Sequence, residues 1–250
     1  MKLYLHIGYP RTGTTTLQRH LYNQHPQINY LGKNLSRSTK EENLNIKFKP
    51  HISEIIDLLL YLSDEEYNKK YDYLLEKIDA LDLSATKTNI LSDEYIILKS
   101  IHYRKAKDKK LETFLSRFEK LFRQKKINVY YIFSIRSPCE LIASRYQTIT
   151  EGTGSIAYTP SDLIEGFSKN KFNNPRLKAL VDGLFYYKLY KHICSITDAN
   201  RIKVLVFEKL MSNSNEYIDE LSEYLKIDNI LSRKISWNKF ENSANELDRE

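Results

Sequence analysis

The chain has 250 residues, of which 41% are hydrophobic and 28% charged, so it suits one sizeable folded domain rather than two. No apolar run approaches the roughly 18 residues that a membrane-spanning helix needs, which argues against an integral membrane protein. The formal net charge of +7 makes anionic ligands, including nucleic acid, partners to consider.

The N-terminal residues predict a strand, a glycine-containing turn and a helix in immediate succession. Residues 3–7 are apolar enough for a short buried strand, and Leu17 and Leu21 have the spacing of one helix face. Gly8 and Gly13 lie between these two elements. A turn of this kind directs backbone N–H groups and a helix N-terminus at an anion, so we expect a phosphate-binding loop here.

The loop has the glycine spacing of a Walker A motif but lacks its lysine. Thr15 occupies the Ser/Thr position, Thr14 stands where the lysine belongs, and the nearest cation is Arg11. A Walker lysine reaches the β and γ phosphates of a nucleoside triphosphate. Without that lysine, the loop suits a 5′-phosphate that carries a smaller group to be transferred. A P-loop kinase or NTPase with an altered loop is the alternative, with Asp93 as its Mg²⁺ ligand.

Strands and helices alternate along the rest of the chain. Apolar runs predict strands over 28–31, 88–92, 127–135 and 202–207. Helical periodicity predicts helices over 14–24, 53–60, 111–124, 161–168, 176–196 and 215–225, and a further helix that begins at Pro138. Ser53 is the expected N-cap of the helix over 53–60. A capping box formed by Ser63 and Glu66 is expected to start another helix, which continues through Ile78. Residues 32–50 are predicted to form a polar loop. This order predicts a single three-layer α/β domain, residues 1–250, with a mostly parallel central sheet.

A second candidate site follows the predicted strand over 127–135. Arg136 stands at the carboxyl end of that strand, where open α/β sheets bind ligands. Ser144 follows eight residues later, about two helical turns away. An arginine fork and a hydroxyl can jointly hold a phosphate. The alternative is structural, with Arg136 capping a strand end and Ser144 as a buried small residue.

Two adjacent carboxylates, Asp93 and Glu94, follow the predicted strand over 88–92. An alcohol is a weak nucleophile at neutral pH, and a positioned carboxylate can take its proton during attack. We favour Glu94 as this general base. The alternative is a helix N-cap at Ser92 or Asp93 with Glu94 in the first turn. His6 is a weaker candidate for the base and is expected to pack beneath the loop.

Together, these motifs resemble those of the sulfotransferases that use 3′-phosphoadenosine 5′-phosphosulfate (PAPS). The bacterial form of their loop reads roughly as an HIG strand end, two variable residues and Lys-Thr-Gly-Thr-Thr. This chain matches it except that Arg11 replaces the lysine. The resemblance implies a P-loop NTPase-like sulfotransferase fold. It also implies a 5′-phosphosulfate site made of Tyr9, Pro10, Arg11, Thr12, Gly13, Thr14, Thr15 and Thr16.

The same resemblance assigns roles outside the loop. Arg136 and Ser144 fall on the family's two 3′-phosphate contact positions. Glu94 stands near the place in the chain where many bacterial members have a glutamate that takes the proton of the acceptor hydroxyl. Asn242 and Ser243 lie where relatives have a polar loop that closes over the nucleotide.

The implied reaction is in-line transfer of a sulfuryl group from PAPS to a hydroxyl, or as second choice an amine, with PAP as product. The acceptor is a carbohydrate, a lipid or a small metabolite, and residues 32–87 are expected to build its pocket. Arg11 would stabilise the leaving phosphate, since it keeps the positive charge of the lysine it replaces. No metal is expected. Nothing in the sequence specifies an oligomeric state.

The basic excess and the cysteines have plainer interpretations. The runs from Arg104 to Lys110 and from Arg123 to Lys126 are best explained as a solvated face, then by an anionic ligand, and least by nucleic acid. Cys139 and Cys194 are predicted to be reduced core residues of a cytosolic protein. Met1 leads directly into the first strand, so we expect no signal peptide and a cytoplasmic location.

Overall fold

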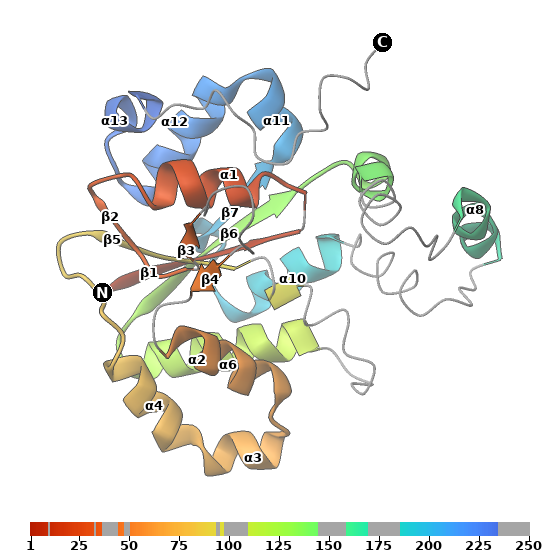
Figure 1. Cartoon of the computed structure of the whole chain (residues 1–250). Helices are drawn as coiled ribbons and strands as arrows, with labels where there is room; N and C mark the ends of the chain where they lie inside the picture. Colours follow the sequence, from red (N-terminus) through yellow and green to blue (C-terminus); the bar gives the residue numbers. More distant parts are fainter. Residues whose placement is uncertain are drawn as a thin grey trace.

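The computed structural model describes residues 1–9, 11–32, 34–36, 45–47, 51–93, 96–97, 110–144, 159–169 and 186–234. A parallel five-stranded sheet with the strand order β2-β5-β1-β6-β7 lies at its centre (Figure 1). Its strands are β2 (Ile28–Tyr30), β5 (Thr88–Ser92), β1 (Lys2–Gly8), β6 (Asn128–Ile135) and β7 (Ile202–Val206). Because the strands are parallel, all their carboxyl ends meet at one edge of the sheet.

Helices cover both faces of this sheet, which confirms the predicted three-layer α/β architecture (Figure 1). One face carries α1 (Thr14–Thr16), η1 (Leu17–Tyr22), α11 (Phe207–Ser212), α12 (Ser214–Leu225) and α13 (Asn229–Lys234). The opposite face carries α2 (Ile52–Tyr61), α3 (Asp64–Lys69), α4 (Tyr71–Asp79), α6 (Lys110–Gln124) and α10 (Tyr186–Ile196). The structure also contains the helix α8 (Pro160–Ser168) and the short 3-10 helix η2 (Ala199–Arg201), and residues 138–144 are helical, as the prediction from Pro138 has it.

The alternation of side chains along β1 explains how one strand supports two cores. Leu3 and Leu5 lie in the buried cluster that α2, α6 and α10 complete, whereas Tyr4 lies in the cluster under η1 and α12. All three side chains are almost fully buried. A central parallel strand is therefore apolar on both faces, as the continuous run over 3–7 indicates.

Some local signals in the sequence act as predicted. The Ser63 hydroxyl accepts from the backbone N–H of Glu66 at 3.2 Å, and the Glu66 carboxylate accepts from the backbone N–H of Ser63 at 2.9 Å. This capping box starts α3. In α6, which is predicted over 111–124, the apolar side chains of Phe114, Phe118 and Leu121 are fully buried.

Other predicted boundaries are wrong. The helix α2 begins at Ile52 after His51, whose backbone is left-handed (φ 73), so Ser53 is not its N-cap. The predicted loop over 32–50 contains a hairpin of two short antiparallel strands, β3 (Asn34–Ser36) and β4 (Asn45–Lys47). These strands have only three residues each, too few to produce a visible alternation.

The helix predicted over 14–24 also differs from the expectation. It ends at Tyr22, and its second part, η1, has π-type hydrogen bonds. For example, the N–H of Asn23 donates to the carbonyl of Gln18 at 3.1 Å. The strand predicted over 202–207 also differs: β7 ends at Val206, and Phe207 is the first residue of α11. Neither a wider helical turn nor a strand-to-helix switch changes the hydrophobic pattern enough to be seen in sequence.

Both cysteines are free thiols, but they are exposed, so the prediction that they lie in the core is wrong. Cys194 lies on the outer side of α10, whose buried positions are Leu189 and Ile193. In the run from Arg123 to Lys126, Arg123 pairs with Glu119 at 2.8 Å, and its side chain is largely exposed. The other predicted basic run, residues 104–110, lies outside the residues whose side chains are described.

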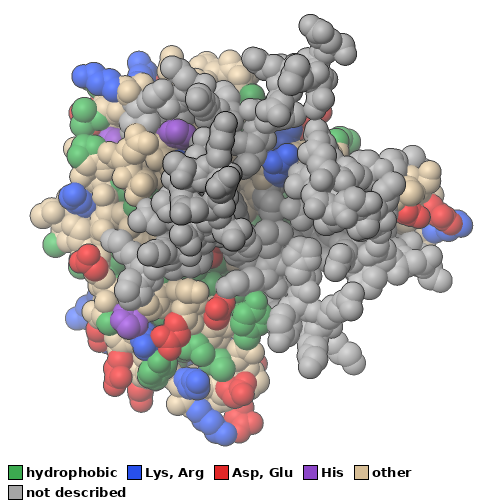
Figure 2. All heavy atoms as spheres, viewed as in Figure 1, with side chains coloured by type: hydrophobic (Ala, Val, Ile, Leu, Met, Phe, Trp, Pro, Cys, Tyr) green, Lys and Arg blue, Asp and Glu red, His purple; other side chains and the backbone are tan. Residues whose placement is uncertain are grey.

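The described surface mixes both signs of charge. Acidic and basic side chains alternate around α3 and α4 in the lower part of Figure 2. No helix among the described residues is both long and apolar enough to cross a bilayer.

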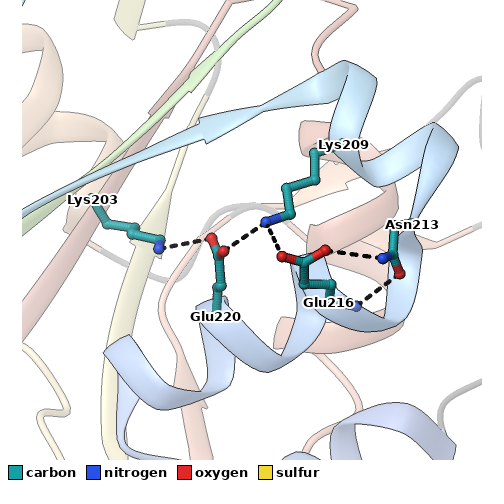
Figure 3. A network of polar contacts seen from close by, with 5 residues as sticks. All are labelled: Lys203, Lys209, Asn213, Glu216 and Glu220. Atoms are coloured by element: carbon teal, nitrogen blue, oxygen red, sulfur yellow. Dashed lines mark hydrogen bonds and ion pairs between the residues drawn. The ribbon is translucent and has the colours of Figure 1, made fainter.

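A polar network ties α11 and α12 to the edge strand β7 (Figure 3). Lys209 of α11 donates to Glu216 at 2.7 Å and to Glu220 at 2.6 Å, both on α12. Lys203 of β7 donates to Glu220 at 3.0 Å, and Asn213 caps α12 through the N–H of Glu216. Hydrogen bonds from Lys209 and Lys203 hold the pKa of the Glu220 carboxyl below its ordinary value. The network therefore fixes the position of α11, which begins at the edge of the sheet where the strands have their carboxyl ends.

Candidate functional site

Four neighbouring strands bring candidate residues to the carboxyl edge of the sheet. Tyr9 follows β1, Asp93 follows β5, Arg136 follows β6, and Phe207 follows β7. In a parallel sheet this edge is the usual place of ligand binding. The two motifs predicted from sequence, although more than a hundred residues apart, therefore share one site.

The loop after β1 depends on its two glycines. A Cβ on Gly8 would lie 2.2 Å from Oγ1 of Thr14, because the loop folds back over the end of its own strand. Gly13 caps α1 with a left-handed backbone (φ 77), and a Cβ there would lie 2.9 Å from Leu210. A larger residue is therefore excluded at Gly8 by steric overlap, and at Gly13 by steric overlap together with the left-handed backbone.

The threonines of the loop have different environments. Thr12, Thr14 and Thr16 are buried, whereas Thr15 is partly exposed. The Thr12 hydroxyl donates to the carbonyl of Tyr9 at 2.6 Å and lies 3.3 Å from Oγ1 of Thr14, so it closes the loop internally. The backbone N–H groups of the first helical turn have no partner within the helix, as at any helix N-terminus, and this is the ordinary basis of anion binding.

The first and second motifs contact each other directly. Nε of Arg11 donates to the Ser144 hydroxyl at 2.9 Å, and Nη1 of Arg136 donates to the carbonyl of Arg11 at 3.2 Å. Arg11 itself has a left-handed backbone (φ 71), which is uncommon for a residue other than glycine. Such strain persists where surrounding contacts hold it, and Arg136 and Ser144 supply contacts here.

Arg136 is held by more than its bond to the loop. Its guanidinium carbon lies 4.6 Å from the centre of the Phe207 ring, and Nη2 lies 3.5 Å from the Glu140 carboxylate. Its Nε is buried and donates to no acceptor in the described part of the chain. A buried donor of this kind is costly unless a ligand satisfies it, which favours an anion at this point.

His6 lies at the centre of a buried polar network beneath the loop. Nδ1 is 2.9 Å from the Ser92 hydroxyl of β5, and Nε2 is 2.8 Å from the Ser134 hydroxyl of β6. Gln18 of η1 donates to the same Ser92 hydroxyl at 3.0 Å. Burial lowers the pKa of His6 from 6.5 to about 3, so the ring is neutral near pH 7. The expectation that His6 packs beneath the loop is confirmed.

The other predicted site residues are placed as follows. The Tyr9 ring is buried against Phe133 and Tyr186, with centroids 5.8 and 4.9 Å away. Burial, with a smaller effect of Tyr186, raises the pKa of the Tyr9 phenol. Asp93 is buried, and its N–H donates to the carbonyl of His6 at 3.3 Å. Pro10, Glu94, Asn242 and Ser243 lie outside the described residues.

Two residues that the sequence analysis missed lie against Arg136. The Tyr186 hydroxyl donates to the carbonyl of Arg136 at 2.9 Å, and the Glu208 carboxylate accepts from the N–H of Ser137 at 2.8 Å. Glu208 follows the strand β7 closely, so the rule that ligands bind at strand ends offers a signal for it. Tyr186 lies in α10, fifty residues beyond Arg136, and carries no such signal.

Within the described ranges, no three His, Cys, Asp or Glu side chains gather as ligands for a metal ion.

No protein-family model and no curated protein sequence matches this chain. Its structure is similar to that of a sulfotransferase from Alicyclobacillus acidocaldarius, with a TM-score of 0.55 and 12% identity over 96% of this chain and 85% of that one. The sulfotransferase domain of the Synechococcus PCC 7002 olefin synthase has a TM-score of 0.42, with 16% identity over 91% and 74%. Mouse sulfotransferase SULT7A1 complexed with PAP has a TM-score of 0.45, with 12% identity over 97% and 67%.

At this identity the first of these likenesses establishes a shared fold, and the predicted sulfotransferase-type architecture is confirmed at that level. The TM-scores of the other two are too low to support more.

Proposed function

We propose that this protein, which shares its fold with a bacterial sulfotransferase, transfers a sulfuryl group from PAPS to an acceptor and releases PAP. The acceptor group is a hydroxyl, with an amine as the second choice. The acceptor molecule is a carbohydrate, a lipid or a small metabolite. PAPS acts as co-substrate, and no metal takes part.

The observation that carries this proposal is the meeting of Arg11, Arg136 and Ser144 at the ligand edge of the sheet. PAPS carries anionic groups at both its 5′ and its 3′ positions. A loop at a helix N-terminus suits the first group, and an arginine with a nearby hydroxyl suits the second. One site that contains both arrangements favours a nucleotide with two separated anionic groups.

The loop also argues against a nucleoside triphosphate. Thr14 is buried at the position of the Walker lysine, and its hydroxyl lies 3.3 Å from that of Thr12. A threonine there supplies no cation for a γ phosphate. The cation at this loop is Arg11, whose Nε holds Ser144. A guanidinium has five N–H donors, so Arg11 can hold Ser144 and still stabilise the leaving phosphate.

In the proposed reaction, the acceptor oxygen attacks sulfur in line with the bridging oxygen of PAPS. The new oxygen–sulfur bond forms as the bond between sulfur and the bridging oxygen breaks. Negative charge develops on the phosphate of PAP, where Arg11 and the N–H groups of the loop would stabilise it. Glu94 would take the proton of the acceptor hydroxyl.

A thermal-shift comparison tests the nucleotide choice. The protein is heated with PAP alone, and separately with ATP and Mg²⁺ at the same concentration. A ligand present at about 100 times its Kd stabilises the folded state by about 2.7 kcal/mol, so the tighter ligand gives the larger shift. We expect PAP without metal to give it. A larger shift from ATP with Mg²⁺, or an obligatory need for Mg²⁺ with PAP, would contradict the proposal and favour a P-loop kinase or NTPase.

The reaction itself is tested with PAPS and a panel of hydroxyl and amine acceptors. PAP release that depends on the acceptor is the expected result. If the protein binds PAP but releases none from PAPS with any acceptor, it is a nucleotide-binding protein and the proposed activity is overturned.

A further inference from the structure

We infer that Tyr186 and Glu208 are positioning residues, which orient the Arg136–Ser137 peptide so that Arg136 selects a nucleotide with a 3′-phosphate. This inference rests on the proposed function, because that function places Arg136 at the 3′-phosphate.

The two residues hold opposite ends of one peptide group. The Tyr186 hydroxyl donates to the carbonyl oxygen of Arg136 at 2.9 Å. The Glu208 carboxylate accepts from the N–H of Ser137 at 2.8 Å. This N–H and the carbonyl of Arg136 belong to the same peptide group. A planar peptide held at both its oxygen and its nitrogen cannot rotate about the axis of the chain. The direction in which the Arg136 side chain leaves the backbone is thereby restricted.

The two contacts come from opposite faces of the sheet. Tyr186 of α10 packs with the cluster that contains Leu5 and Phe133. Glu208 lies in α11, whose Phe207 and Leu210 pack with the cluster on the other face. The turn after β6 is therefore clamped between the two outer layers of the protein. Movement of either layer would move the peptide.

The chemistry of both bonds suits this role. Burial raises the pKa of Tyr186 to about 12, so its hydroxyl keeps its proton near neutral pH and can donate. A bond from an N–H to a carboxylate is charge-assisted and stronger than one between neutral groups. Position 137 already holds serine, a residue that often caps a helix by itself. The backbone N–H of Ser137 is nevertheless held by a side chain 71 residues away.

The same end of α11 also contacts the Arg136 side chain. Phe207, adjacent to Glu208, lies under the guanidinium at 4.6 Å. The next residue, Lys209, joins the network that fixes α11 to α12 and β7 (Figure 3). One short helix therefore orients both the backbone and the side chain of Arg136, and its own position is fixed by ion pairs.

Calorimetry with two probes tests the inference on the full chain. PAP and adenosine 5′-phosphate (AMP) differ only by the 3′-phosphate. We expect Glu208→Ala and Tyr186→Phe each to weaken PAP roughly three- to tenfold, the range for one hydrogen bond, and to change AMP less than about twofold. Glu208→Gln keeps an acceptor oxygen and should recover part of the PAP affinity. If Glu208→Ala does not fold, Tyr186→Phe, which removes one oxygen atom, decides the question.

Two matched controls use neighbouring side chains that do not contact the peptide. Glu223→Ala removes an exposed carboxylate of α12 outside the network of Figure 3, and Tyr187→Phe removes the hydroxyl of an exposed tyrosine. Both should bind PAP like the wild type. If the controls weaken PAP as much as Glu208→Ala and Tyr186→Phe do, general loosening of the helices explains the effect, and the inference is overturned.

A double-mutant cycle separates positioning from general stability. In an Arg136→Ala background, Glu208→Ala and Tyr186→Phe should weaken PAP no further, because they act through Arg136. Equal losses of PAP and AMP, or losses that add to that of Arg136→Ala, would overturn the inference while the proposed function stands. A wild-type protein that binds PAP no better than AMP would instead contradict the proposed site itself.

Discussion

At the scale of single residues, Arg136 has the role that is easiest to isolate. Its guanidinium lies on Phe207 and bonds the backbone of Arg11. The carboxylate of Glu140, which pairs with the guanidinium, is 3.5 Å away and largely exposed, so this ion pair contributes little to stability. The positive charge of Arg136 is therefore available to a ligand.

Removing Arg136 should reduce affinity only where a 3′-phosphate is present. A charge-assisted hydrogen bond contributes about 1.5–3 kcal/mol, so Arg136→Ala should weaken PAP about tenfold or more. AMP should lose much less, and calorimetry with both nucleotides measures the difference. Arg233→Ala, which removes an exposed arginine paired with Asp219, is the matched control. Equal losses for both nucleotides would move Arg136 away from the 3′-phosphate.

The proposed general base gives a second prediction at this scale. Glu94→Gln should leave PAP binding nearly intact and lower turnover by roughly 10²–10⁴, since glutamine cannot take the acceptor's proton. Steady-state turnover at saturating PAPS measures the effect.

Asp93→Asn is the neighbouring control and should do less, because Asp93 is buried at the end of β5. A larger loss of turnover in Asp93→Asn than in Glu94→Gln would assign the base to Asp93. If neither substitution slows turnover, the proton goes elsewhere, and His6 or His102, a histidine eight residues after Glu94 in the chain, is the next residue to change.

At the scale of elements, the loop after β1 depends on contact with the end of its own strand. A Cβ on Gly8 would come within 2.2 Å of Oγ1 of Thr14, far inside normal contact. Overpacking of this kind costs about 1–3 kcal/mol. Gly8→Ala should therefore lower the free energy of unfolding by that amount, as measured by urea denaturation, and weaken PAP.

Thr14→Ala tests whether contact with the Thr14 hydroxyl causes the destabilisation by Gly8→Ala. It removes the hydroxyl that a Cβ on Gly8 would meet, so Gly8→Ala should cost less in the Thr14→Ala background than in the wild type. Strictly additive costs would show that the contact with Thr14 is not the cause.

At the scale of the whole molecule, His6 couples stability to pH from the middle of the sheet. Its pKa falls from 6.5 to about 3 on folding because burial disfavours the charged ring. The unfolded chain therefore binds more protons between these two values, and stability is lost as pH falls through them. From pH 7.5 to pH 5 this contribution amounts to about 2 kcal/mol.

Urea denaturation at the two pH values checks this coupling. The difference in unfolding free energy between the wild type and His6→Gln should change by about 2 kcal/mol between pH 7.5 and pH 5, to the disadvantage of the wild type. A pH-independent difference for His6→Gln would mean that His6 titrates normally in the folded protein.

Local features of this protein could be read from its sequence alone. Glycine spacing, apolar runs and capping residues act within a few residues of one another. They therefore sufficed for the loop, the strands β1, β5, β6 and β7, the capping box at Ser63 and the three-layer class. The position of Arg136 at a strand end is local in the same sense.

Only the tertiary structure decided which distant side chains meet. The strand order β2-β5-β1-β6-β7, the bond from Arg11 to Ser144 and the clamp of Tyr186 and Glu208 all join residues far apart in the chain. Such contacts depend on how whole layers pack, and no periodicity records them. The exposure of both cysteines has the same origin, because a helix buries only the face that its neighbours cover.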